Sequence, residues 1–240
     1  MIDFQAIILA AGKGRRFNSL TKNIPKCLLP IGKTTILDRQ IDILLKNGID
    51  DIIIITGYKS NLIKDHFSKK NVKIVYNEKY ETFDSLFSIW CAKNFIKNSF
   101  ICIYGDLIFD EELISSFLQN NTNNCIIVDN PPNVFDNHSV IIENSLIKNI
   151  NFNVKNKMPS GQFIGICKFT KSSVSLFKKT LDFFKENNDL NGEFVRIIKS
   201  LLEQNIDIHA FFVNKNTWIN INDETKLELA KKTFERFSDS

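Results

Sequence analysis

An apolar run that ends abruptly in a glycine-containing loop is the feature of this sequence that most restricts its fold. Within the stretch Ala6–Pro30, apolar residues, small residues and cations follow one another as Ile7, Ile8, Leu9, Ala10, Ala11, Gly12, Gly14, Arg15, Arg16, Pro25 and Lys26. Glycine lets the backbone adopt positive φ and approach a ligand closely, and successive backbone N–H groups form an anion-binding concavity. The sequence therefore predicts a strand that leads into a phosphate-binding loop. The alternative is an ordinary strand-to-helix turn with surface cations.

Two common phosphate-binding motifs do not match this stretch. The Walker motif ends in a Lys-Ser or Lys-Thr pair that this stretch lacks, and Phe17 stands where the dinucleotide fingerprint has its third glycine. The pattern L-x-A-G-x-G-x-R with a later Pro-Lys does match, at Leu9, Ala11, Gly12, Gly14, Arg16, Pro25 and Lys26. It resembles the signature of nucleotidyltransferases that couple a nucleoside triphosphate to a phosphorylated small molecule and release pyrophosphate. The resemblance implies that the nucleotide binds along Leu9–Gly14, and that Arg16 and Lys26 are catalytic cations that hold the triphosphate.

Short apolar runs alternate with helical patterns through the first half of the chain. Strands are predicted at Asp51–Thr56, Val72–Tyr76, Phe100–Tyr104 and Cys125–Asp129, and helices at Thr35–Lys46, Ser60–Phe67, Asp84–Phe95 and Asp110–Gln119. Wholly apolar strands are typical of parallel sheets that are buried on both faces. We therefore expect an α/β fold, a single-domain, Rossmann-like, open and mostly parallel (mixed) sheet with helices on both faces. The resemblance implies the nucleotide-diphospho-sugar transferase type of this fold.

The second half of the chain is less regular. The predicted elements are a hairpin of Ser139–Glu143 and Leu146–Ile150, strands at Phe163–Phe169 and Ile208–Val213, and helices at Lys171–Lys185, Glu193–Gln204 and Asp223–Phe237. A prolyl pair, Pro131-Pro132, closes the strand before this half, and a polar loop is expected at Asn153–Ser160. Because no linker divides the chain, we expect one nucleotidyltransferase domain over residues 1–240. Its halves would be nucleotide-binding (1–130) and acceptor-side (131–240).

Composition and charge narrow the class of protein. The chain is 43% hydrophobic and 24% charged with a net charge of +4, and its basic residues are spread along the sequence, so no nucleic-acid-binding tail is predicted. Five cysteines without a close pair argue against a disulfide framework or a zinc site. No apolar run reaches the roughly 18 residues of a membrane span. We expect a cytoplasmic protein without nucleic-acid or membrane partners. The sequence does not decide its oligomeric state, and a homo-oligomer is one of the options.

The pair Gly105-Asp106 directly follows the predicted strand Phe100–Tyr104. Ligands of open α/β sheets bind beyond the carboxyl ends of the strands, so this carboxylate is expected at the same edge as the glycine loop. Transfer from a nucleoside triphosphate needs a divalent cation, and magnesium takes oxygen ligands. We therefore predict Mg²⁺ as cofactor and Asp106 as its ligand, the role that the resemblance also implies. A turn or cap aspartate is the alternative.

A second metal ligand is predicted in the run Trp218–Asp223 (WININD). In the family that the chain resembles, a similar Trp precedes an acidic pair whose second member binds the metal, whereas here Asn220 and Asn222 occupy both positions. An amide oxygen binds magnesium without adding charge, and the N-acetylglucosamine-1-phosphate uridylyltransferases carry Asn at the matching place. Asn222 is thus the predicted ligand. Asp223 is the alternative, either as a shifted ligand or as the cap of the last helix.

The segment Asn77–Trp90 resembles the matching part of cytidylyltransferases that activate phosphocholine and related small phosphoesters or phosphonates. A Tyr-containing segment leads into the polar pair Asp84-Ser85 and then into a Leu-x-Ser-x-Trp-like helix start. In those proteins this region lies against the base and the acceptor, which implies that Asp84 and Ser85 bind the nucleotide. The alternative is that Asp84 only caps the helix.

Together these features predict a CTP-dependent cytidylyltransferase. It would transfer CMP from CTP to a small phosphorylated acceptor (phosphocholine, phosphoethanolamine or a phosphonate) and release pyrophosphate, in the synthesis of a cell-surface polysaccharide or lipid precursor. The acceptor's phosphate oxygen is already anionic, so no general base is required and positioning does most of the catalysis. Asn222 favours a sugar-1-phosphate uridylyl- or thymidylyltransferase instead. The loss of both acids near Trp218 favours a catalytically inert nucleotide-binding regulatory subunit.

Overall fold

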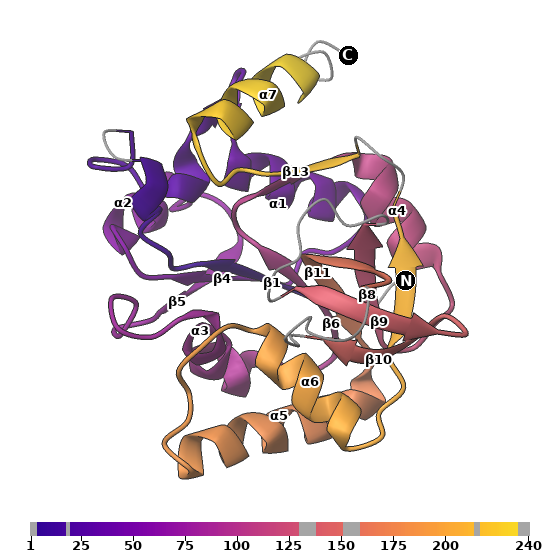
Figure 1. The fold of residues 1–240 in the computed structure, drawn as a ribbon. Helices are drawn as coiled ribbons and strands as arrows, with labels where there is room; N and C mark the ends of the chain where they lie inside the picture. Colours follow the sequence, from indigo (N-terminus) through magenta and orange to yellow (C-terminus); the bar gives the residue numbers. More distant parts are fainter. Residues whose placement is uncertain (1–3, 18–19, 130–137, 151–158, 214–216, 235–240) are drawn as a thin grey trace.

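One mixed β-sheet runs through the molecule, with helices on both of its faces (Figure 1). The computed structural model describes residues 4–17, 20–129, 138–150, 159–213 and 217–234. In this part of the chain the sheet has nine strands, in the spatial order β5 (Val72–Tyr76), β4 (Ile52–Thr56), β1 (Phe4–Ala10), β6 (Ser99–Tyr104), β11 (Gly161–Phe169), β8 (Cys125–Asp129), β12 (His209–Phe212), β10 (Leu146–Ile150) and β9 (Ser139–Glu143). The predicted α/β fold with an open, mixed sheet is confirmed.

Strand direction decides which loops meet at each edge of the sheet. The first four strands in this order are parallel to one another, whereas β11 runs antiparallel to both β6 and β8. Neighbouring β1 and β6 pair Leu9 with Tyr104, near the carboxyl ends of both strands. The loop with Gly12 and Gly14 and the pair Gly105-Asp106 therefore begin at the same edge, as the sequence predicts.

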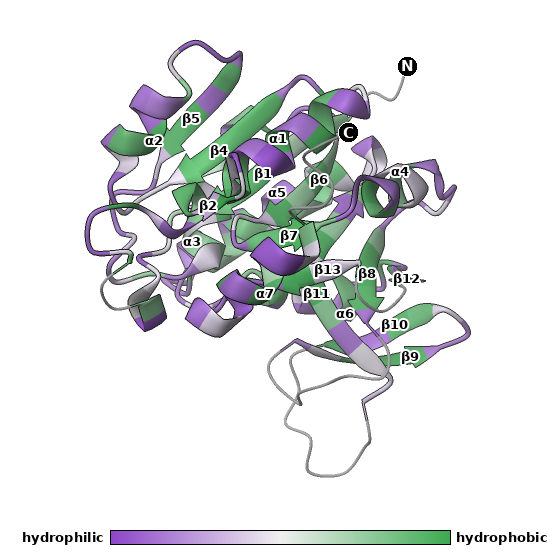
Figure 2. Cartoon of the chain, turned by 90° about the horizontal axis from the view of Figure 1, so that it is seen from above, coloured by the Kyte–Doolittle hydropathy of each residue, from purple (hydrophilic) through white to green (hydrophobic). Residues whose placement is uncertain are grey.

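Helices cover the two faces of the sheet in separate groups (Figure 1). One face carries α3 (Ser85–Ala92), α5 (Lys171–Glu186) and α6 (Val195–Glu203), and the other carries α1 (Ile36–Lys46), α2 (Ser60–His66) and α4 (Glu111–Gln119). Ile7 of β1 packs into the first core and Ile8 into the second. Because both faces of the central strands are buried, nearly every residue in them is apolar, and the strands are mostly hydrophobic in Figure 2.

A smaller layer lies beside the carboxyl edge of β1 and β6. It contains the short strands β2 (Pro30–Ile31), β3 (Thr34–Thr35), β7 (Leu107–Phe109) and β13 (Trp218–Asn220), the 3₁₀ turns η1 (Arg15–Phe17) and η2 (Lys26–Leu28), and α7 (Glu224–Phe234). Phe17, Ile108 and Ile221 share one apolar cluster there. Strand β13 pairs antiparallel with β7 and sets Asn220 opposite Leu107. This pairing was not predicted, and it brings the end of the chain next to Gly105-Asp106.

The predicted helices are confirmed with small shifts at their ends, and the last turn of the third helix is a separate 3₁₀ turn, η3 (Lys93–Phe95). Several predictions lie outside the described residues: Pro131-Pro132, positions 153–158 of the polar loop, the end of the last helix and the boundary between the two halves. In the part of the chain that is described, no helix is long and apolar enough to cross a membrane.

Candidate active site

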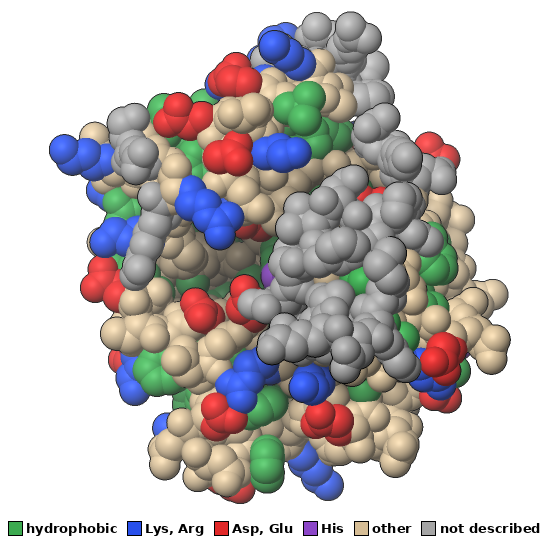
Figure 3. All heavy atoms as spheres, viewed as in Figure 1, with side chains coloured by type: hydrophobic (Ala, Val, Ile, Leu, Met, Phe, Trp, Pro, Cys, Tyr) green, Lys and Arg blue, Asp and Glu red, His purple; other side chains and the backbone are tan. Residues whose placement is uncertain are grey.

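A cavity of about 670 Å³ opens at the carboxyl edge of β1 and β6. Figure 3 shows this hollow, with acidic and basic side chains around its rim. Its walls come from both halves of the chain and include Leu9, Ala10, Ala11, Gly12, Lys13, Gly14, Lys26, Cys27, Tyr80, Glu81, Asp84, Ser85, Tyr104, Gly105, Asp106, Asn191 and Glu193. Most of the residues that the sequence predicts for a nucleotide site are thus gathered around one space.

The two glycines of the loop differ in how closely they are packed. Gly14 has φ +63°, and a Cβ atom there would lie 3.2 Å from both the Cβ of Lys26 and the Cγ2 of Thr21. The Gly14 carbonyl accepts hydrogen bonds from the Phe17 amide and the Thr21 hydroxyl, each at 3.0 Å. Glycine is therefore required at position 14, because a left-handed conformation and close packing coincide there. At Gly12 no atom lies within 4 Å of an added Cβ, so this residue faces open space.

The turn after β6 is pressed against β1. The Gly105 amide donates to the Leu9 carbonyl at 2.9 Å, and a Cβ on Gly105 would lie only 2.9 Å from that same oxygen. On its other side the Asp106 carbonyl accepts a hydrogen bond from the Ile221 amide at 2.8 Å. The backbone of Asp106 is thus fixed between the N-terminal strand and the segment that follows β13.

Lys26 contacts both Asp106 and Asn222, the two predicted metal ligands. Its Nζ lies 2.7 Å from Oδ2 of Asp106 and 3.4 Å from Oδ1 of Asn222, and it sits 5.5 Å from the centroid of the Phe17 ring. The Lys26 side chain is 13% exposed and that of Asp106 28%, so the pair is largely shielded from water but open to the cavity. An ammonium group has three N–H donors, so Lys26 can bind a phosphate while it keeps both contacts.

Side-chain oxygen atoms of Asp106, Asn220 and Asn222 are the candidates for magnesium ligands in this part of the structure. Asp106 Oδ1 and Asn220 Oδ1 are buried and have no hydrogen-bond partner among the described residues. The described residues contain no group of three His, Cys, Asp or Glu side chains that could hold a metal by themselves. Magnesium needs no such cage, because it is usually held by one or two protein oxygens together with substrate phosphates and water. Asp106 with Asn222 meets that requirement.

Asp223 is placed as a helix cap. Its Oδ1 accepts a hydrogen bond from the Lys226 amide at 2.8 Å, at the start of α7. This is the bond pattern of an N-cap residue. Of the two readings of Asp223, this contact supports the cap over the shifted metal ligand.

The remaining predicted residues differ in how they meet the cavity. Asp84 is exposed at the N-cap position of α3, lines the cavity and makes no side-chain capping bond, so its carboxylate can face a ligand. Ser85 Oγ accepts a hydrogen bond from the Phe194 amide at 2.7 Å and docks the second half of the chain onto α3, which leaves its own O–H to donate. Arg16 is an exposed residue of η1, just beyond Gly14, and is not among the residues that line the cavity.

Sequence reasoning missed several residues of the cavity wall. Tyr104 is half-buried, but its hydroxyl oxygen is buried and has no hydrogen-bond partner within the described ranges. Desolvation raises the pKa of this phenol well above its usual value, so it stays neutral. Its ring packs edge-on against Phe163 and Phe194, at centroid distances of 6.0 and 6.3 Å. The only local signal is a tyrosine at the carboxyl end of a strand, directly before Gly105-Asp106.

Two opposite charges bridge the mouth of the cavity. Lys13 Nζ from the glycine loop lies 3.4 Å from Glu81 Oε1 and 5.6 Å from the centroid of the Tyr58 ring. Both charged side chains are largely exposed, so this pair adds little to stability. No pattern in the sequence connects the two positions, because Lys13 follows β1 and Glu81 follows β5, and these strands are brought near each other by the spatial order β5-β4-β1.

Comparison with known proteins shows which family the sequence matches. Residues 6–156 match the sequence profile of the MobA-like NTP transferase domain. The bifunctional protein GlmU of Methanococcus aeolicus is 34% identical over 209 residues, which cover 83% of this chain and 47% of that protein. This chain therefore spans about half the length of that relative. The CTP:phosphoglutamine cytidylyltransferase of Campylobacter jejuni is 26% identical, with 93% of this chain and 98% of that protein covered.

A solved structure shares the fold. The CTP:phosphocholine cytidylyltransferase of Streptococcus pneumoniae superimposes with a TM-score of 0.84 over 95% of this chain and 98% of that one, at 20% sequence identity. At that identity the likeness establishes the fold alone.

Proposed function

Because the chain belongs to the family of MobA-like NTP transferase domains, we propose that it transfers CMP from CTP to a small phosphorylated acceptor and releases pyrophosphate. The observation that carries the proposal is the meeting of Lys26 and Asp106 in the wall of the cavity edged by the glycine loop, with Asn222 in contact with Lys26. A cation, a carboxylate and the backbone amides of a glycine loop at one sheet edge are suited to bind a nucleoside triphosphate.

The triphosphate would lie along Gly12–Gly14, with the base against Leu9–Gly12. Lys26 supplies a positive charge beside this loop, since Gly14 packs directly on its side chain. Arg16 stands just outside the cavity at the end of the same loop, where a long guanidinium side chain would have to swing inward to reach a phosphate. We assign the main catalytic role to Lys26 and an accessory role to Arg16.

Asp106 and Asn222 would hold Mg²⁺. The unpartnered Oδ1 of Asp106 is the first candidate ligand, and the amide oxygen of Asn222 is the second. The ion would supply positive charge near the phosphates as the reaction proceeds. With only one carboxylate among these ligands, we expect metal affinity to depend strongly on the bound nucleotide.

The reaction that we propose is a single in-line displacement. A phosphate or phosphonate oxygen of the acceptor forms a bond to the α-phosphorus of CTP, and the bond between that phosphorus and the α–β bridging oxygen breaks. The leaving pyrophosphate carries the new negative charge, which Lys26 is placed to offset. Because the attacking oxygen is already ionised, the protein has to orient rather than deprotonate it.

The acceptor would bind on the side formed by the second half of the chain. Asn191 and Glu193 line the cavity there, and Ser85 and Phe194 fasten this wall to α3. We accordingly propose that residues 1–130 bind mainly the nucleotide and residues 131–240 the acceptor. The full-length likeness to a CTP:phosphoglutamine cytidylyltransferase supports a compact phosphoester or a phosphorylated amide as acceptor.

A second candidate is a sugar-1-phosphate uridylyl- or thymidylyltransferase. Asn222 in place of an acid favours it, since the N-acetylglucosamine-1-phosphate enzymes carry the same residue there. The two candidates differ in the base of the nucleotide and in the acceptor. They share the cavity and the cations, so only a substrate test separates them.

The test is a substrate matrix with the full chain. CTP, UTP, dTTP, ATP and GTP are each combined with Mg²⁺ and with phosphocholine, phosphoethanolamine, an aminoalkyl phosphonate, phosphoglutamine, glucose 1-phosphate or N-acetylglucosamine 1-phosphate, and pyrophosphate is measured. We expect release with CTP and a non-sugar acceptor, and none after chelation of Mg²⁺ with EDTA. Release confined to UTP or dTTP with a sugar phosphate supports the second candidate. Nucleotide binding without any release indicates an inert regulatory subunit.

A further inference from the structure

A buried glutamine on α1 holds the turn that carries Asp106. Gln40 is 1% exposed, and its Nε2 donates to the carbonyl oxygen of Tyr104 at 3.0 Å and to that of Leu107 at 2.8 Å. These carbonyls stand on either side of Gly105-Asp106, so a single amide group bridges both ends of the turn between β6 and β7. Both N–H donors of the glutamine side chain are used in this way.

The bridge completes the support of the Asp106 backbone. The Gly105 amide is bonded to Leu9 of β1, and the Asp106 carbonyl to the amide of Ile221. Gln40 adds a contact from a third direction, the helix layer. Without it, the turn would keep its attachment to β1 and to the segment after β13 but would lose the link that sets the carbonyls of Tyr104 and Leu107.

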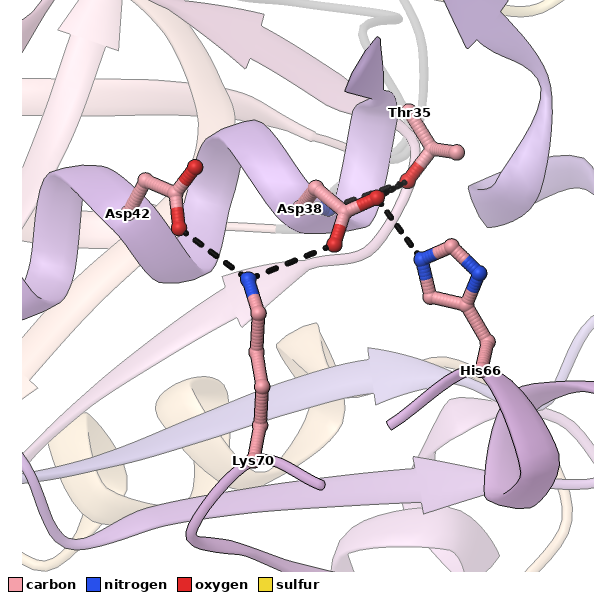
Figure 4. A network of polar contacts seen from close by, with 5 residues as sticks. All are labelled: Thr35, Asp38, Asp42, His66 and Lys70. Atoms are coloured by element: carbon pink, nitrogen blue, oxygen red, sulfur yellow. Dashed lines mark hydrogen bonds and ion pairs between the residues drawn. The ribbon is translucent and has the colours of Figure 1, made fainter. Parts of the chain in front are cut away.

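The helix that carries Gln40 is itself anchored on its outer side (Figure 4). Lys70 Nζ lies 3.2 Å from Asp42 Oδ1 and 3.4 Å from Asp38 Oδ1. His66 Nε2 lies 2.8 Å from Asp38 Oδ2, and Thr35 Oγ1 accepts the Asp38 amide at the N-cap of α1. These contacts tie α1 to α2 and to the residues just after it. Gln40 therefore reaches the turn from a support that is fixed on both sides.

Stability alone does not account for a glutamine at this place. Gln40 Oε1 is buried and has no hydrogen-bond partner in the described part of the chain, and a buried acceptor left unpaired opposes folding. An apolar side chain of similar size would avoid that cost, although the Tyr104 and Leu107 carbonyls would then lose this donor. What such a side chain could not do is donate to the two carbonyls that flank Asp106.

We propose that Gln40 is a positioning residue that sets the direction of the Asp106 carboxylate toward the Mg²⁺ site. The inference rests on the proposed function, in which Asp106 is a metal ligand. Gln40 itself touches neither metal nor substrate in this scheme. It acts through the backbone of the turn, as outer-shell residues do when they orient a ligand.

The decisive variant is Gln40→Met in the full chain. Methionine keeps the length of the side chain and removes both the donors and the unpartnered acceptor, so it separates positioning from packing. The first readout is Mn²⁺ binding without nucleotide, followed by the electron paramagnetic resonance signal of free Mn²⁺. The second is the Mg²⁺ concentration at half-maximal pyrophosphate release. Loss of an outer-shell partner typically weakens metal affinity by roughly 10- to 100-fold, and we expect a change of that order in both.

Arg39→Met is the matched control. Arg39 precedes Gln40 on α1 and donates to the Phe109 carbonyl at 3.5 Å, in the same strand β7 but beyond the turn. It also lies over the Phe234 ring, with its guanidinium carbon 5.2 Å from the centroid. We expect Arg39→Met to lower the melting temperature and to leave the affinity for Mn²⁺ and the half-saturating Mg²⁺ concentration unchanged.

The outcomes separate this inference from the proposed function. Wild-type affinity for Mn²⁺ in Gln40→Met overturns the positioning role, as does an equal loss of affinity in Arg39→Met. A wild-type chain that binds no Mn²⁺ also overturns it, because there is then no metal site to position. If the wild type binds Mn²⁺ and the methionine variant does not, while no nucleotide yields pyrophosphate, Gln40 keeps its role and the transferase assignment fails.

Discussion

Replacing Lys26 by methionine is the most direct test of the catalytic arrangement. The ammonium group lies 2.7 Å from Asp106 and 3.4 Å from Asn222, at the end of a side chain that packs against Gly14. Methionine retains most of that packing and removes the charge. The variant therefore loses the cation next to the glycine loop while the walls of the cavity stay in place.

The expected loss follows from the charge and its surroundings. A unit charge about 4 Å from a phosphate oxygen contributes roughly 4 kcal/mol at the effective dielectric constant of about 20 that suits partly buried groups. Part of this energy already stabilises the ion pair with Asp106, and part stabilises bound CTP as much as the transition state. Only the interaction that becomes stronger as pyrophosphate leaves affects turnover. Removing one preorganised donor of this kind costs about 2.7–4 kcal/mol, that is, 10²–10³-fold in kcat. We expect Lys26→Met to fall in that range.

The assay is the initial rate of pyrophosphate release at saturating CTP and acceptor, with CTP affinity measured separately by calorimetry. Lys46→Met is a matched control, because Lys46 forms an ion pair of nearly the same length with Glu111, at 2.8 Å, on the exposed surface. The control is expected to keep wild-type turnover. A Lys26→Met enzyme that retains a third or more of kcat would refute the role of Lys26 in stabilising the leaving group.

Three other measurements probe separate parts of the reasoning. Gly14→Ala should lower the free energy of unfolding in urea by about 1–2 kcal/mol, because φ is +63° and two side chains lie 3.2 Å from the added carbon, whereas Gly12→Ala should change it little. Asn222→Ala should weaken Mn²⁺ binding about tenfold. Asp223→Ala should lower only the melting temperature, because a helix cap is lost. Weaker Mn²⁺ binding in Asp223→Ala but not in Asn222→Ala would make Asp223 the ligand. Burial raises the pKa of the Cys27 thiol from 9.0 to about 12, so the unfolded chain ionises first and stability falls above about pH 9. Cys27→Ala should reduce the loss of stability between about pH 8 and about pH 10, measured by urea titration, by roughly 1.4 kcal/mol in total.

The fold could be predicted from the sequence because its central strands are buried on both faces. Ile52–Thr56 and Ser99–Tyr104 lie inside the sheet, so each reads as an apolar run with no polar alternation. Parallel order then follows from the helices between them, and with it the meeting of Gly14 and Asp106 at one edge. These steps need only local patterns and the handedness of crossovers.

The second half of the site could not be predicted in the same way. Strands β7 and β13 have three residues each, which is too short to show a periodic pattern, and they lie far apart in the chain. Yet their pairing brings Asn222 close to Lys26. Gln40 does leave a signal, since it lies four residues after Ile36 and four before Leu44 on the apolar face of its helix. A polar residue at such a position has to find its partners inside the protein, but the sequence does not say which carbonyls they are.

The asparagine that departs from the family pattern has a reason in the charge balance of the site. Lys26 and Asp106 carry one positive and one negative charge, and Asn222 adds none, so the three side chains together are neutral. An acid at position 222 would bind metal more tightly but would leave this group with a net negative charge facing a polyphosphate. With an amide there, the oxygen still accepts a hydrogen bond from Lys26. The ammonium would then attract the nucleotide more strongly, because no second carboxylate offsets its charge. Under the proposed function, such a site would depend more on the bound triphosphate to hold the metal ion than a site with two carboxylates would.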